Sequence, residues 1–166
     1  MSTKPESAHA DPTRQLLRHT LATLAYRAGK ALRGAPASFA TYSTSVQPKT
    51  PAQILAHMGD LFDWALTLAK GAQEWHDSTP LLWEKEADRF FSALKKFDDY
   101  LASGAPSQES AEKLFQGPIA DALTHTGQLA MLRRMAGAPM KGENYHRAEI
   151  LAGRVGFDQS PPKREF

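Results

Sequence analysis

The stretch PIADALTHTGQLAMLRRMA, residues 118–136, decides the fold because its composition and its boundaries both predict a long helix. Gly117 and Pro118 stand at its beginning, and Gly137 stands just past its end. Proline is favoured at the first position of a helix and glycine just beyond the last. We therefore expect a helix that begins at Pro118 and ends before Gly137.

Polar residues of this helix lie in line with its apolar side. Arg133 and Arg134 mark the solvent side, so the opposite side carries Met131, Leu132 and Met135. Following that side back in steps of three and four residues leads to Gln128, His125 and Asp121. Burying an acid or a histidine without a partner costs several kcal/mol, on the order of 2–7 for a polar group. The pattern predicts that Asp121 and His125 have a hydrogen-bond partner, an ion partner or a metal.

The rest of the chain predicts three more long helices and no strand. Three amphipathic segments begin with proline directly after a capping residue: 12–34, 51–70 and 80–102. A shorter helical piece is expected at 107–115, and 35–50 is expected to be a long connection. The fold class is therefore all-α, a four-helix bundle with a long crossover connection. We expect a disordered tail at 1–10, a single domain at 11–157 and a mobile C-terminal tail at 158–166.

Composition excludes several classes of function. The 166 residues contain no cysteine, so disulfides, thiolate ligands and a cysteine nucleophile are absent, and a metal would need His, Asp, Glu or water. The net charge of +2 comes from interspersed charges, which predicts no nucleic-acid partner. No apolar run approaches the roughly 20 residues of a membrane span, and no signal peptide is evident. We expect a cytoplasmic protein that does not bind membranes.

A second inward-leaning histidine lies on another helix. His57 stands at the edge of the apolar side of segment 51–70, so it could face Asp121 and His125 across the bundle. Three protein ligands with one position left to water is the arrangement of catalytic zinc sites. The alternative is that Asp121 only pairs with His125 and that His57 is a core histidine with satisfied hydrogen bonds.

The other acids and histidines predict no site. Asp60 and Asp63 fall on the polar side of segment 51–70, whereas His76 and His146 fall in loops. Loop histidines are usually only solvated, although loops also carry functional sites.

Two segments, ILAHMGDLFDWAL at 54–66 and GPIADALTHTGQLAMLRRMAG at 117–137, resemble the DinB/YfiT-like family of small four-helix metalloproteins. In that family a histidine of the second helix joins two histidines of an H-x-x-x-H motif that is followed by a G-Q-L-like continuation. His57 matches the first ligand, and His125 with Gly127, Gln128 and Leu129 matches the last. The middle position is Asp121 rather than histidine, so the resemblance implies a two-histidine, one-carboxylate set.

The resemblance also implies a class of chemistry. Family members include thiol transferases that use bacterial low-molecular-weight thiols, an isomerase, and many proteins with no assigned reaction. We therefore expect a metal-dependent transferase or hydrolase in which a divalent ion, zinc or nickel before iron or manganese, activates a thiol or water. Its substrate would be a small molecule, and Gln128 would support His125 or orient the substrate.

The resemblance further implies a homodimer. The alternative function is a non-enzymatic metal-binding or structural bundle dimer, with a role in stress as one option.

Overall fold

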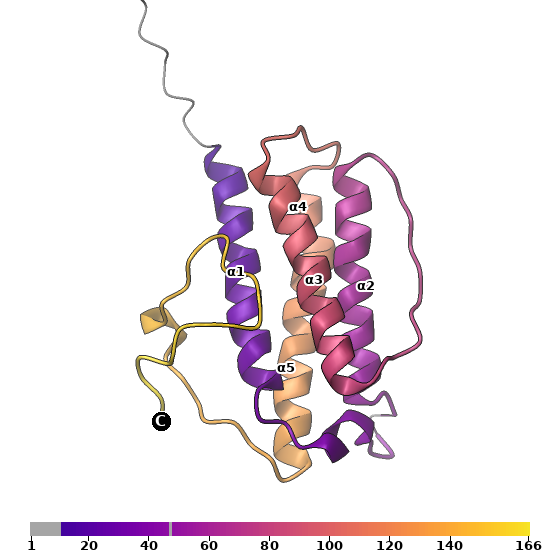
Figure 1. Cartoon of the computed structure of the whole chain (residues 1–166), viewed down its shortest axis with the longest axis vertical. Coiled ribbons are helices and arrows are strands. Elements are labelled where there is room, and N and C mark those ends of the chain that lie inside the picture. The colour runs from indigo at the N-terminus through magenta and orange to yellow at the C-terminus, as the bar shows by residue number, and fades with distance from the viewer. Residues whose placement is uncertain (1–10, 47) are drawn as a thin grey trace, which may run out of the picture.

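The computed structural model describes residues 11–46 and 48–166, and the predicted tail at 1–10 lies outside them. Four long helices pack side by side: α1 (Pro12–Leu32), α2 (Pro51–Ala69), α3 (Trp83–Ala102) and α5 (Ala120–Met135) (Figure 1). A short α4 (Ala111–Leu114) precedes α5, and 3₁₀ turns lie at Ala37–Thr41 and Tyr145–Arg147. Within the described ranges there is no strand, only an isolated bridge between Glu143 and Glu165. The predicted all-α class is confirmed.

Local capping explains where α1 and α2 begin. The Asp11 side chain accepts a hydrogen bond from the Thr13 N–H at 3.0 Å, and proline follows at the first helical position. Thr50 and Gln53 form a reciprocal capping box, with the Thr50 N–H donating to Gln53 Oε1 at 2.8 Å. Each cap satisfies backbone donors that have no partner inside the helix. Both helix starts follow the sequence prediction.

Helices α2 and α3 run in the same direction. Ala56 lies beside Arg89 near one end, and Ala69 lies beside Tyr100 near the other. Parallel neighbours cannot be joined by a tight turn, so residues 70–82 return along the length of the bundle (Figure 1). The sequence predicted a long connection only at 35–50, but the segment that joins these parallel neighbours is 70–82.

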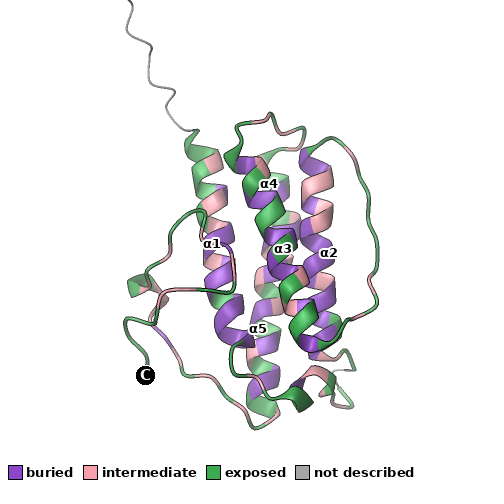
Figure 2. Ribbon diagram, viewed as in Figure 1, coloured by how far each residue is buried: buried purple, intermediate pink, exposed green. Residues whose placement is uncertain are grey.

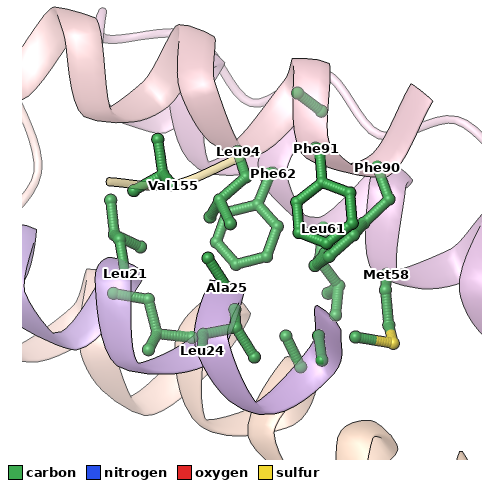
Figure 3. Close-up of a cluster of buried hydrophobic side chains, with 14 of the residues drawn as sticks. Leu21, Leu24, Ala25, Met58, Leu61, Phe62, Phe90, Phe91, Leu94 and Val155 are labelled. Carbon is green, nitrogen blue, oxygen red and sulfur yellow. The ribbon is translucent and has the colours of Figure 1, made fainter. Parts of the chain in front are cut away.

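The core lies between the four long helices. Phe62 of α2 is fully buried and lies 6.1 Å from Phe90 and 6.3 Å from Phe97, ring centre to ring centre. Figure 3 shows Phe62 among side chains of α1 and α3, and Val155 of the C-terminal segment belongs to the same cluster. Buried positions form stripes along the inner sides of the helices (Figure 2), as amphipathic periodicity requires.

The start of α3 differs from the prediction. Its first helical residue is Trp83, not Pro80, and residues 79–82 are not helical. The buried Glu86 side chain folds back and accepts a hydrogen bond from the Leu81 N–H at 2.8 Å. That bond holds the segment before Trp83 out of helical geometry and gives a backbone donor its partner.

Gly117 and Pro118 do not separate two helices. The chain continues from α4 into α5 through a π-helical turn, Phe115–Ile119, which contains Pro118. Proline has no N–H to donate and its ring obstructs the ordinary α-helical bond, so a local widening of the helix accommodates it. The predicted break at this position is therefore wrong.

The predicted sides of α5 are also wrong near its C-terminus. Met131 and Met135 are 55% and 51% exposed, whereas Arg133 is only 6% exposed. Arg133 donates to the carbonyl oxygens of Ala31 at 3.1 Å and Arg33 at 2.8 Å. These carbonyls belong to the end of α1, where helical partners run out, so the guanidinium replaces the missing donors. A long polar side chain is buried here because a neighbouring helix ends beside it.

The C-terminal segment after Gly137 wraps over α1 (Figure 1). The Lys30 ammonium donates to Glu143 at 2.6 Å and to Glu165 at 2.9 Å, and the Phe166 N–H donates to the Gly142 carbonyl. Burial alone would lower the pKa of Lys30, but its two carboxylate partners raise it above its ordinary value. Residues 158–166, expected to be a mobile tail, thus include contacts to α1.

None of the helices in the described ranges has the length and apolar character needed to span a membrane.

Candidate metal centre

Three predicted site residues meet across the seam between α2 and α5. His57 Nε2 lies 3.3 Å from Asp121 Oδ2, and His125 Nε2 lies 3.3 Å from Asp121 Oδ1. One ligand atom of each residue lies within 4.8 Å of the others. The predicted meeting of His57 with Asp121 and His125 across two helices is therefore present.

These distances suit a single divalent ion. Ligand atoms that each lie about 2.0–2.1 Å from one ion at tetrahedral angles are about 3.3 Å apart. Each histidine nitrogen lies at this distance from a carboxylate oxygen, His57 from Oδ2 and His125 from Oδ1 of Asp121. A neutral N–H···O bond is shorter, about 2.9 Å, so the two contacts are long for hydrogen bonds. The three residues could therefore hold a metal ion such as zinc.

Gln128 holds the ring of His125. His125 Nδ1 lies 2.7 Å from Gln128 Oε1, and because an amide oxygen only accepts, the ring nitrogen is the donor. In the neutral ring Nε2 is then the unprotonated nitrogen, and it lies 3.3 Å from Asp121 Oδ1. Gln128 thus contacts His125 directly, and its role in supporting a metal ligand stays a prediction.

The trio lies at the surface of the bundle rather than on a buried face. The side chains of His57, Asp121 and His125 are 28%, 45% and 15% exposed. This corrects the expectation that the polar line of α5 continues a buried apolar side. Exposure leaves room for an exogenous ligand beside the three side chains, which a closed structural site does not offer.

Aromatic rings flank the His57 side of the trio. Trp75 of the 70–82 connection lies 5.5 Å from His57 and 5.8 Å from Trp64 of α2, edge to face in both pairs. His57 and His125 are also in edge contact, at 4.9 Å. Sequence reasoning did not place Trp75 at the site, because nothing in its spacing indicates which helix the connection passes.

A second cluster of potential ligands is Asp60, Asp63 and His76. His76 Nε2 lies 3.0 Å from Asp60 and 3.4 Å from Asp63. Arg89 already occupies this cluster, because its Nη1 donates to Asp60 Oδ1 at 3.0 Å. A fixed guanidinium beside the carboxylates opposes a divalent cation, so this cluster is better explained as an ion-pair network.

The network anchors the 70–82 connection to α2. Asp60 is buried and accepts hydrogen bonds from Ser78, from the backbone N–H at 2.8 Å and from the hydroxyl at 2.6 Å. Burial alone would raise the pKa of Asp60, but the bonds from Ser78 and Arg89 lower it below its ordinary value. Asp60 was predicted on the solvent side of α2, and that prediction is wrong because the connection covers it. The sequence carries no signal that would have paired Asp60 with Ser78 or Arg89.

Comparison of the chain with known protein families, curated proteins and solved structures found no match.

Proposed function

We propose that this protein is a metal-dependent enzyme of the thiol transferase or hydrolase type, with His57, Asp121 and His125 as ligands of one divalent ion. The observation that carries the proposal is the 3.3 Å spacing of both histidine nitrogens from the two carboxylate oxygens. Zinc or nickel suits two imidazoles and a carboxylate, and iron or manganese is an alternative. A bound ion would act as a Lewis acid that lowers the pKa of water or of a thiol in the remaining position.

The protein's own residues would adjust that chemistry. Asp121 brings a negative charge that a third histidine would not, so the site attracts an anionic thiolate less strongly. Gln128 keeps the His125 ring in one tautomer and one orientation. The same arrangement agrees with a DinB/YfiT-like protein. We therefore extend the proposal to a small-molecule substrate, with a low-molecular-weight thiol among the candidates. We also propose a homodimer, and light scattering would measure its mass.

A structural role is the second candidate. The contacts of Asp121 with His57 and His125 join α2 to α5, and such a network could hold two helices together without a metal. Metal affinity separates the two functions, because only the first requires an ion.

Calorimetric titration of metal-free protein with zinc tests the proposal. We expect His57→Ala, His125→Ala and Asp121→Ala to abolish measurable binding, and Asp121→His to retain it. Gln128→Ala should weaken binding by roughly 10- to 100-fold, as for other residues that orient a ligand. Circular dichroism of each variant controls for folding.

His76→Ala is the matched control, because His76 belongs to the other cluster. Its zinc affinity should equal that of the wild type. The proposal fails if zinc does not bind, if binding survives in both His57→Ala and His125→Ala, or if His76→Ala alone removes it.

A further inference from the structure

A groove of about 430 Å³ begins at Asp121 and runs along the seam between α2 and the start of α5. Leu61 and Trp64 of α2 line one side, and Gly117 and Ala120 line the other. Small-molecule sites are usually clefts of roughly 300–1,000 Å³ with mostly apolar walls. The groove is therefore large enough for part of a substrate, and it opens directly onto one of the proposed ligands.

Small residues make the groove wide at its centre. A Cβ atom built on Gly117 would lie 3.9 Å from the Trp64 ring, at ordinary van der Waals distance. Gly117 lies in the π-helical turn, and its backbone has no positive φ. The backbone angles at position 117 do not require glycine, and the absence of a side chain there leaves space beside the indole of Trp64.

Away from Asp121 the lining residues of the groove carry no charge. Asp121 is the charged side chain that lines it, and no lysine or arginine is among its lining residues. Asp121 itself is a proposed ligand of the divalent ion, so the uncharged remainder of the groove decides what packs there. A substrate carboxylate or phosphate in that part would find no cation among the lining residues, whereas a neutral group needs none.

The one aromatic residue that lines the groove favours a planar ring. Trp64 lines the groove, and Trp75 packs edge to face against it at 5.8 Å. Aromatic rings pack edge to face or offset against one another, and such a pair adds to the burial of apolar area. We propose that the substrate of this site carries a neutral aromatic group, which packs against Trp64 in the groove while the reacting end lies beside Asp121. This inference rests on the proposed metal centre.

The test compares benzyl mercaptan with ethanethiol, which shares the thiol but lacks the ring. Both probes are titrated into zinc-loaded and into metal-free protein, and the indole N–H resonances of the three tryptophans are recorded. Benzyl mercaptan should shift the resonances of Trp64 and Trp75. Trp83 serves as an internal reference, because it packs on Phe39 with a ring distance of 5.6 Å, among the buried core residues. Burying the ring should give benzyl mercaptan a roughly 10- to 100-fold higher affinity for the zinc-loaded protein.

Two matched glycine variants locate the effect. Gly117→Leu should fill the groove and remove the higher affinity of benzyl mercaptan relative to ethanethiol. It should leave the zinc affinity unchanged. Gly127→Leu, on α5 where a Cβ meets nothing within 4 Å, should leave the advantage intact. If Gly117→Leu fails to fold, Trp64→Leu takes its place and should reduce the advantage.

Equal affinity for the two thiols in the zinc-loaded wild type overturns the inference, as does an advantage that survives in Gly117→Leu. If the wild type binds no zinc, the proposed function fails. The metal-free titration then still tests whether the groove binds an aromatic ring. There, shifts at Trp64 with benzyl mercaptan and not with ethanethiol support the groove as an aromatic site, and their absence refutes it.

Discussion

Replacing Gly59 with alanine should destabilise the protein, although alanine is the better helix former. Gly59 lies within α2, and a Cβ there would come within 2.8 Å of the Arg89 guanidinium. That guanidinium cannot simply swing away, because it donates to Glu86 at 2.6 Å, to Asp60 at 3.0 Å and to the Ala56 carbonyl. The added methyl group must therefore displace a side chain that is bonded on three sides.

The size of the effect follows from two opposing terms. Alanine in place of glycine in a helix interior stabilises by about 1 kcal/mol. A hydrogen bond to a charged group contributes roughly 1.5–3 kcal/mol. If Arg89 loses one or two of its bonds, the net change is a loss of roughly 0.5–5 kcal/mol in the free energy of unfolding.

Urea denaturation followed by circular dichroism measures this difference. The matched control is Gly127→Ala on α5, where a Cβ meets nothing within 4 Å. The control should be neutral or stabilised by up to about 1 kcal/mol. If Gly59→Ala is as stable as Gly127→Ala, the argument that Arg89 is held in place is wrong.

Two other predictions concern the polar groups that the tertiary structure buries. Arg133→Met should lower the free energy of unfolding by roughly 2–4 kcal/mol, because it leaves carbonyls at the end of α1 without donors. Arg134 lies on the exposed side, so Arg134→Met should change the free energy of unfolding by less than about 0.5 kcal/mol in the same urea assay. The pKa of Asp60 is lowered in the folded state. The stability that the ionised Asp60 contributes is therefore fully present above its unfolded pKa of about 4, and it is lost as the pH falls through its folded pKa. Unfolding at pH 7, 5 and 3 should show that Asp60→Asn loses less stability on acidification than the wild type, and equal acid sensitivity of the two proteins would contradict this.

The sequence by itself determined that the chain forms long helices and where α1 and α2 begin, because caps depend on residues close together in the chain. The caps at Asp11 and Thr50 act within three residues, and both predicted helix starts are present. The spacing of four between Asp121 and His125 likewise places them on one side of α5, where His125 Nε2 lies 3.3 Å from Asp121 Oδ1. The choice of His57 as the partner from α2 came from its position and from the family resemblance together, and the structure brings it to the same point.

Only the tertiary structure decided which polar groups are buried and what surrounds the site. Arg133 is buried because α1 ends beside it, and Asp60 is buried because the 70–82 connection passes over it. Trp75 reaches His57 by the same route. Periodicity along one helix identifies the side that carries more apolar residues, but it contains no information on where another segment ends or crosses. The contacts of Arg133 with Ala31 and Arg33 join residues 102 and 100 positions apart, and they depend on the packing of the whole bundle.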